Sequence, residues 1–253
     1  MAIAKMITDR RTAENLGEEG LAVLRAHLFA GDCQRCNRPL GSEPPSLVVD
    51  EMTPEMAWAR LHHRRCRPAR WNTGQVMVIE GLGDTVSWSA RALIFPMRIG
   101  ILPFLPRPSR QTRYPALLVN PGLECVIMEK GERGWRPGLE AWFTGNGLHA
   151  VPWDLRKSMA LPGASGQIYD KSITVALSVS PNPYGAPADQ ETLALAGATG
   201  GFLLMATHAF KPGDLTSGPH ADLMKAIAAG DVLGGWVALD NSRQRDSRGG
   251  NVL

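Results

Sequence analysis

Three cysteines and one histidine in the first quarter of the chain have the side-chain types and the spacing of a metal-ligand set. Cys33 and Cys36 are separated by two residues, and so are His63 and Cys66. Zn²⁺ prefers thiolate and imidazole ligands, and two ligands three positions apart can reach one ion from a single tight turn. The sequence therefore predicts a tetrahedral zinc site at these four residues.

The residues that follow the first pair support this interpretation. Residues 37–41 include asparagine, proline and glycine, which favour a tight turn. Backbone amides in such a turn are free to hydrogen-bond the sulfur atoms. Because four protein ligands leave no coordination position for a substrate, we expect the zinc to be structural and not catalytic.

The second pair is predicted to lie on a helix. Thr53 is a good N-cap and Pro54 suits the first helical position. If this helix continues to about Arg65, the histidine and the cysteine of the second pair project from one face. His62 lies four residues before the cysteine and fits geometrically as well. The sequence favours His63 as the ligand but leaves both histidines open.

Zinc competes with three alternative interpretations of the cysteines. A redox-active Cys-x-x-Cys pair normally follows a strand and opens a helix, whereas this pair follows a helical pattern that ends at Gly31. A disulfide framework suits a secreted chain, but the N-terminal sequence MAIAKMITDRR has no apolar segment of the secretion-signal kind. Unconnected core cysteines would not explain the paired spacing. Zinc coordination accounts best for the whole pattern.

The expected order of elements around the ligands is a knuckle, a strand at 47–52 and a helix. Over residues 31–72 this order resembles treble-clef-like zinc modules. In many such folds the second ligand pair lies at the start of the terminal helix, whereas here it would lie near the end. The strand carries Asp50 and Glu51 and no histidine, so the sequence lacks a His-Asn-His nuclease pattern. The resemblance thus implies a zinc-stabilised fold and no nuclease activity.

Composition sets broad limits on the class of protein. The 253 residues carry a formal net charge of +3, which does not by itself indicate a polyanionic partner. Arginine outnumbers lysine, and alanine, glycine and proline are plentiful, as in proteins of high-GC bacteria. The chain has no apolar run of about 18 residues, so we expect no membrane span and a cytoplasmic location.

The residue pattern predicts an α+β fold with three regions. These are a helix plus a treble-clef-like zinc-knuckle module at 1–72, a β-rich α+β domain at 73–240 and a disordered tail at 241–253. Residues 1–11 are expected to be frayed. A helix at 15–30 should be capped by Asn15 and ended by Gly31.

Runs of β-forming residues broken by Gly and Pro predict a mostly antiparallel body. The runs lie at 76–80, 85–89, 91–101, 116–120 and 123–130, with a hairpin turn at 131–134. Residues 145–188 are rich in Gly, Pro and Ser and should form long loops around one strand at 173–179.

The C-terminal part changes pattern again. A helix is expected at 189–196, a strand at 201–207, a helix at 219–229 ended by Gly230, and a strand at 234–239. A strand-helix-strand run of this length predicts a right-handed parallel crossover.

Other candidates for chemistry are weaker. Gly81-Leu82-Gly83 lacks the third glycine and the helix of a dinucleotide-binding loop, so we interpret it as a hairpin turn. Ser165 lacks the spacing of a nucleophile elbow and is expected in a flexible loop. Cys125 is expected to be a buried, inert thiol and not a fifth ligand. Isolated histidines, interpreted as structural, are His149, His208 and His220.

Two basic features bear on possible partners. Arginines crowd the second ligand pair and are candidate contacts to phosphate groups of a nucleic acid; they are Arg60, Arg64, Arg65, Arg67 and Arg70. Residues 85–123 contain no acidic residue and form a second basic segment. However, residues 1–72 contain 11 basic and 9 acidic side chains, so those arginines can equally pair with neighbouring carboxylates.

These observations favour a non-enzymatic binding or assembly protein that is stabilised by structural Zn²⁺. Its partner would be another protein or a nucleic acid, and not a membrane. The alternative is a hydrolase whose catalytic groups are scattered in the sequence and assemble near His149, Asp154, His208 or His220.

Overall fold

The computed structural model describes residues 5–28, 30–73, 90–98, 111–123, 125–132, 134–151, 160–177, 183–209 and 221–240. They fall into two compact units. The N-terminal unit takes its residues from 1–89, 120–145 and 208–216, and the C-terminal unit from 90–119, 146–207 and 217–253. Neither unit is continuous in the sequence, and each is described separately.

A five-stranded sheet forms the centre of the N-terminal unit, in the order β3-β1-β2-β6-β7. Its strands are β1 (Ser46–Thr53), β2 (Met56–His62), β3 (Arg70–Asn72), β6 (Val126–Gly131) and β7 (Gly134–Pro137). Only the β1–β3 pair is parallel among these described strands. Because β6 pairs with β2, residues beyond position 120 complete the sheet that begins near the ligand cysteines.

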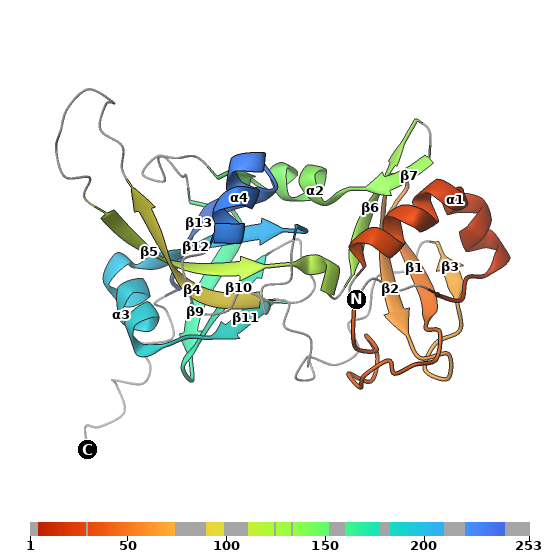
Figure 1. The fold of residues 1–253 in the computed structure, drawn as a ribbon, viewed down its shortest axis with the longest axis horizontal. Coiled ribbons are helices and arrows are strands. Elements are labelled where there is room, and N and C mark those ends of the chain that lie inside the picture. Colours follow the sequence, from red (N-terminus) through yellow and green to blue (C-terminus); the bar gives the residue numbers. More distant parts are fainter. Residues whose placement is uncertain are drawn as a thin grey trace, which may run out of the picture. The chain divides into compact units, whose positions relative to one another are not determined.

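Helix α1 (Arg10–His27) packs against this sheet, contacting β7 and β3 (Figure 1). The Asp9 side chain caps it by accepting a hydrogen bond from the Thr12 N–H at 2.9 Å. The expected cap at Asn15 is therefore wrong, because an earlier aspartate offers the same chemistry. Gly17, with φ of +63°, interrupts the helix, and Leu28 is its C-cap in place of the predicted glycine at position 31.

The chain before α1 is more ordered than predicted. Ile7 forms a parallel bridge with Ser46, and its N–H donates to the Pro45 carbonyl at 2.8 Å. Residues 5–9 thus lead into the helix beside the start of β1, which corrects the expectation of a frayed start. Residues 1–4 lie outside the described residues.

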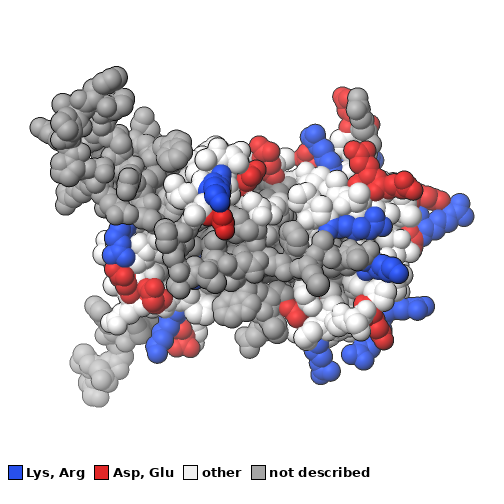
Figure 2. Space-filling view, viewed as in Figure 1, with Lys and Arg blue, Asp and Glu red and all other residues white. Residues whose placement is uncertain are grey.

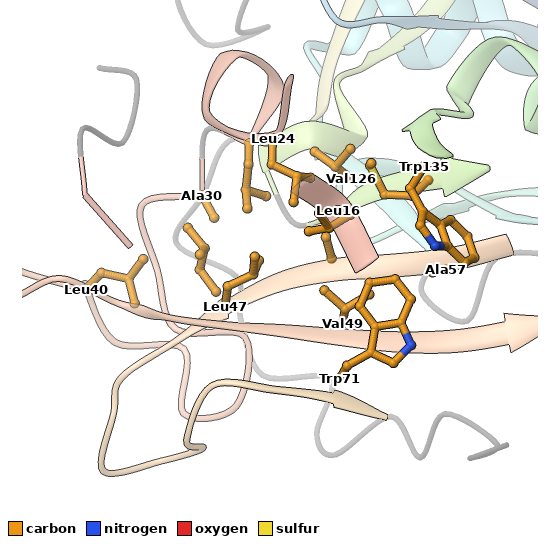
Figure 3. Close-up of a cluster of buried hydrophobic side chains, with 14 of the residues drawn as sticks. Leu16, Leu24, Ala30, Leu40, Leu47, Val49, Ala57, Trp71, Val126 and Trp135 are labelled. Carbon is orange, nitrogen blue, oxygen red and sulfur yellow. The ribbon is translucent and has the colours of Figure 1, made fainter. Parts of the chain in front are cut away.

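One face of the sheet and the apolar side of α1 enclose a hydrophobic core (Figure 3). Leu24 of α1 and Leu47 of β1 are fully buried there, and the indoles of Trp71 and Trp135 meet edge-on with centroids 5.3 Å apart. Along β2 the core residues alternate, at Ala57, Ala59 and Leu61. This period of two is the signature of a strand.

The predicted helix from Thr53 is wrong, because β1 and β2 form a hairpin there. The Thr53 hydroxyl accepts the Glu55 N–H at 3.3 Å and stabilises the turn that joins the strands. A hydroxyl that can cap a helix can equally stabilise a tight turn. Both faces of β2 are buried: Trp58 and His62, on the face away from the core, are only 4 % and 1 % exposed. The sequence of β2 therefore does not show the alternation of apolar and polar residues that would indicate a strand.

The C-terminal unit contains two sheets, ordered β4-β5-β12-β13-β8 and β11-β10-β9. The strands of the first are β4 (Ala90–Arg98), β5 (Gln111–Val119), β8 (His149–Ala150), β12 (Gly201–Thr207) and β13 (Val232–Ala238). Those of the second are β9 (Ala164–Tyr169), β10 (Ser172–Leu177) and β11 (Tyr184–Pro187). Helix α3 (Gln190–Thr199) packs on β5 and β12, and α4 (Ala221–Ala229) on β13.

Two expectations about this unit are wrong. The segment expected to be mostly loop contains four described strands, β8 to β11, which are short and carry the Gly and Ser residues that suggested loops. The pair β12 and β13 is antiparallel and adjacent, so it is not a parallel crossover. Parallel pairing occurs instead between β12 and β5, which comes much earlier in the chain.

The predicted fold class is confirmed: an N-terminal helix, a Cys/His cluster, mostly antiparallel sheets and a C-terminal strand-helix-strand unit. The strand at 201–207 and the hairpin turn at 131–134 have the predicted positions. The expected strands at 76–80 and 85–89 and the expected tail at 241–253 lie outside the described residues. Helix α2 (Leu139–Gly145) and the short 3₁₀ helix η1 (Pro121–Leu123) complete the elements.

Candidate metal centre

The first ligand pair lies on a tight turn between α1 and β1. The Asn37 N–H donates to the Cys33 carbonyl at 2.9 Å, and the Cys33 N–H donates to the Arg38 carbonyl at 2.9 Å. Asn37 has φ of +54°, a left-handed conformation that asparagine tolerates better than most residues. These local bonds explain why the Cys-x-x-Cys sequence folds into a knuckle.

The second pair lies on a matching turn directly after β2. The His63 carbonyl accepts the N–H groups of Cys66 at 2.9 Å and Arg67 at 3.1 Å. The structure thus places this pair on a turn and not on the predicted helix. Residues three positions apart lie on one side of a tight turn as well as on one face of a helix. The spacing therefore predicted residues that do converge, although it placed them on the wrong element.

The four side chains converge. One sulfur each from Cys33, Cys36 and Cys66 and one ring nitrogen of His63 lie within 4.8 Å of one another. The His63 Nδ1 is 3.4 Å from the Cys36 Sγ and 3.8 Å from the Cys66 Sγ. A tetrahedral ion with ordinary zinc bond lengths would separate such atoms by about 3.6 Å. All three cysteines are free thiols, so the four residues can hold one metal ion.

Hydrogen bonds orient the histidine ligand. The His63 Nε2 lies 2.9 Å from the Pro39 carbonyl oxygen, which only accepts hydrogen bonds, so Nε2 carries the proton. The lone pair is then on Nδ1, which faces the sulfurs. The His63 N–H also lies 3.3 Å from the Cys33 Sγ, to which it donates. An imidazole held by a backbone carbonyl in this way is the usual support of a metal-bound histidine.

Further bonds join the two turns to each other. The Gln34 N–H donates to the Leu61 carbonyl at 3.0 Å, and the Arg35 guanidinium donates to the Cys66 carbonyl at 2.5 Å. The cysteines also contact the apolar core: Cys33 belongs to it, and Cys36 and Cys66 pack against it. The cluster is therefore continuous with the packed body of the unit.

The thiols differ in acidity. Burial opposes ionisation of Cys33, but hydrogen bonds from the backbone of Arg35, His63 and Cys36 outweigh it and lower the pKa of this thiol from 9.0 to about 7. Burial, followed by the neighbouring Cys36 and Cys33 sulfurs, raises the pKa of Cys66 from 9.0 to about 11. A thiolate forms readily at Cys33, and a second one at Cys66 is disfavoured until a cation balances the charge.

Of the two candidate histidines, only His63 joins the cysteines. His62 points to the other face of the sheet, where it is buried and its ring nitrogens have no hydrogen-bond partner among the described residues. Burial, together with the charges of Arg60 and Arg67, lowers the pKa of His62 to about 3, so it is neutral.

The candidate anion contacts divide into two groups. Arg60 donates to the Asp50 carboxylate at 2.5 Å and its side chain is 12 % exposed, while Arg67 is half-buried. Arg64, Arg65 and Arg70 are exposed. Arg38, on the first turn, is also exposed. It was not among the predicted contacts, because in the sequence it lies far from the group of arginines that begins at Arg60. Acidic and basic side chains are interspersed among the described residues on the face that Figure 2 shows.

A hollow of about 640 Å³ lies beside the metal cluster in the N-terminal unit. It is lined by segments 40–43 and 63–65, so His63, Arg64 and Arg65 of the second turn border it. A metal ligand and two exposed cations thus meet at one concave part of the surface.

Apart from His208, which lies outside the cysteine cluster, the remaining sequence candidates do not gather into a second site in the described residues. His149 is exposed on β8, and Ser165 lies within β9 and not in the predicted loop. Cys125 is buried and outside the ligand cluster, as predicted. The Arg113 guanidinium in the basic segment pairs with Glu191. Asp154, His220 and the glycines at 81–83 lie outside the described residues.

Comparison with protein-family models, with curated proteins and with solved structures gave no match to this chain. None of the helices in the described residues is long and apolar enough to span a membrane.

Proposed function

We propose that this protein is a non-enzymatic binding or assembly protein whose N-terminal unit is stabilised by structural Zn²⁺. The observation that carries the proposal is the convergence of three sulfurs and one imidazole nitrogen within 4.8 Å. Thiolate and imidazole ligands suit zinc and disfavour Mg²⁺ and Ca²⁺, which prefer oxygen. Four protein ligands complete a tetrahedron and leave no position at which a substrate would be activated.

In this proposal the zinc clamps two turns that are otherwise joined to each other mainly by a few hydrogen bonds. The turns are separated in sequence by the β1–β2 hairpin and are joined by a few hydrogen bonds, such as that from the Gln34 N–H to the Leu61 carbonyl. Metal coordination contributes far more than a few such bonds, since structural zinc sites bind with apparent free energies of about 10–16 kcal/mol at pH 7. The clamp would give the surface of the turns a fixed shape.

The exposed arginines on that surface favour a negatively charged partner, and nucleic acid is the class of partner that we propose to test. Arg38 lies on the first turn, and Arg64 and Arg65 on the second, beside the hollow. Exposed arginines at fixed positions can each donate to phosphate oxygens. Arg60 is tied to Asp50, so the proposal depends on the exposed arginines only.

The test is binding of zinc-loaded protein to heparin and to a single-stranded oligonucleotide over a range of salt concentrations. The Arg38→Ala/Arg64→Ala/Arg65→Ala variant should elute from heparin at lower salt. The slope of log K against log salt should fall by about two, because each lost phosphate contact removes about 0.7 on single strands.

A matched control is the Arg10→Ala/Arg11→Ala/Arg25→Ala variant, which removes the same charge from exposed positions on α1. It should retain most of the binding. Equal elution of both variants would show that only net charge matters, and unchanged elution of the first variant would exclude this surface as the contact.

A further inference from the structure

Two histidines outside the cysteine cluster form a pair in the N-terminal unit. His27 lies in the last turn of α1, and His208 follows directly after β12 in sequence. Their ring centroids are 5.6 Å apart, with the planes inclined at 56°. Neither residue takes part in the metal centre described above.

Asn120 fixes the orientation of one ring. Its side-chain oxygen accepts the Gly122 N–H at 2.9 Å, which identifies that atom as the carbonyl oxygen. The same oxygen lies 3.2 Å from the His208 Nδ1. Since this oxygen only accepts hydrogen bonds, Nδ1 carries the proton and the lone pair of His208 is on Nε2. This arrangement orients an imidazole as metal-bound histidines are oriented.

The backbone around the pair is tightly packed. A Cβ atom at Gly122 would lie 2.4 Å from the His27 carbonyl oxygen and 3.2 Å from the His208 Nδ1. Only glycine fits between the end of α1 and the His208 ring. The loop at 120–122 therefore holds both histidines at a set separation.

Each ring has a buried nitrogen that lacks a hydrogen-bond partner among the described residues: Nδ1 of His27 and Nε2 of His208. Leaving a buried polar atom unpaired is unfavourable, so two such atoms in adjacent rings need an explanation. Burial, followed by the charge of His27, lowers the pKa of His208 to about 4. At neutral pH this ring is therefore uncharged and offers a lone pair.

We propose that His27 and His208 together bind one divalent transition-metal ion, through Nδ1 of the first and Nε2 of the second. With metal–nitrogen bonds of about 2.0–2.1 Å, each ring centroid lies about 3.2 Å from the ion, so the two centroids would be about 5.2–5.5 Å apart. A bridging water with hydrogen bonds of about 2.8 Å would separate them by about 6.3 Å. The observed 5.6 Å fits the metal better.

The ligand type defines the class of metal. Imidazole suits Zn²⁺, Cu²⁺ and Ni²⁺ and disfavours Mg²⁺ and Ca²⁺. With two protein ligands, water molecules complete the coordination sphere, so this ion is bound more weakly than one held by three thiolates and an imidazole. The site is independent of the proposed function, because it shares no residue with the cysteine cluster.

The test is a titration of the full-length protein, with the cysteine site already zinc-loaded, by further Zn²⁺ in equilibrium dialysis. The wild-type protein should take up a second equivalent. The variants His27→Ala and His208→Ala should each weaken that second binding at least tenfold, because one shared ion needs both rings. The control is His149→Ala, which removes an exposed histidine and should leave both equivalents in place.

Copper provides a readout that needs no variant. Cu²⁺ added to the zinc-loaded wild-type protein should give a paramagnetic resonance spectrum with coupling to two imidazole nitrogens. A single zinc equivalent in the wild-type protein, or a second equivalent that survives both histidine variants, would overturn the proposal. Coupling to fewer than two nitrogens would overturn it too.

Discussion

The two turns that carry the metal ligands and the sheet behind them are held together by different forces. Between the turns of Cys33 and Cys66 the contacts are mainly the converging candidate ligand atoms and hydrogen bonds to the backbone, although Cys33 is also buried in the apolar core. In the sheet and α1, buried side chains such as Leu24, Leu47 and Trp71 interlock. With the proposed ion bound, the first region depends on a few strong bonds from four atoms, and the second on many weak contacts.

This difference predicts how each region fails. If the turns hold the proposed ion, removing one candidate ligand removes a coordination bond that no other described residue of the cluster replaces. Removing one side chain from the core leaves a cavity that its neighbours partly tolerate. The opposite face of the sheet adds a third case, because a buried ion pair of Asp50 and Arg60 lies there in place of apolar contacts. Three substitutions separate these cases.

The largest effect is expected from Cys33→Ser. Loss of one of three thiolates should abolish stoichiometric zinc binding and remove most of the roughly 10–16 kcal/mol that such a site contributes. Zinc content measured by mass spectrometry should fall from one equivalent toward zero at the cysteine site. Hydrogen exchange at residues 33–40 and 63–67 should accelerate.

Cys125→Ser is the matched control for that experiment, because it removes a buried thiol outside the cluster. Its zinc content at the cysteine site should remain at one equivalent. Full zinc occupancy in the Cys33→Ser variant would contradict the assignment of this ligand.

The next effect is expected from Asp50→Asn. Arg60 would then be left buried without its counter-charge, at a cost of about 3–5 kcal/mol in the free energy of unfolding at pH 7. The loss should be visible in urea denaturation of the zinc-loaded protein. Zinc content should not change, since neither residue is a ligand.

The same pair predicts a dependence on pH. Burial opposes ionisation of Asp50, but Arg60 and the Asn72 amide outweigh it and lower the pKa of this carboxyl. A depressed folded-state pKa contributes stability above the unfolded value of about 3.9, and this contribution is lost as the pH falls through the folded value. Below pH 4 the stability of the wild-type protein should therefore approach that of Asp50→Asn. A constant difference between the two down to pH 2 would argue against this ion pair.

The smallest of the three effects is expected from Leu24→Ala. This fully buried side chain joins α1 to the sheet, so its truncation should lower the free energy of unfolding by about 2–5 kcal/mol. The exposed Glu19 on the same helix provides a control, because Glu19→Ala should cost well under 1 kcal/mol. If Leu24→Ala lost zinc as completely as Cys33→Ser, zinc binding by the turns would depend on the packing of the core, and the two regions would not be stabilised independently.

Part of the candidate site could be predicted from local chemistry. The ligand residues follow from side-chain type and from a three-residue spacing, which a turn and a helix both satisfy. The element that carries His63 and Cys66 could not be predicted, because Thr53 and Pro54 favour a helix start and a turn alike. The segment Met56–His62 is a strand because it pairs with Ser46–Thr53 on one side and with Val126–Gly131 on the other. This long-range pairing is not visible in the local sequence.

The sequence by itself determined which atoms can bind a metal, where the ends of many strands and helices lie, and that the fold is α+β, since these depend on residue type and short-range spacing. Only the tertiary structure decided that His63 and not His62 faces the sulfurs, that Arg60 forms an ion pair with Asp50, and that the rings of His27 and His208 lie side by side. Those outcomes depend on which residues far apart in the chain are brought together, and sheet register fixes that through long-range hydrogen bonds.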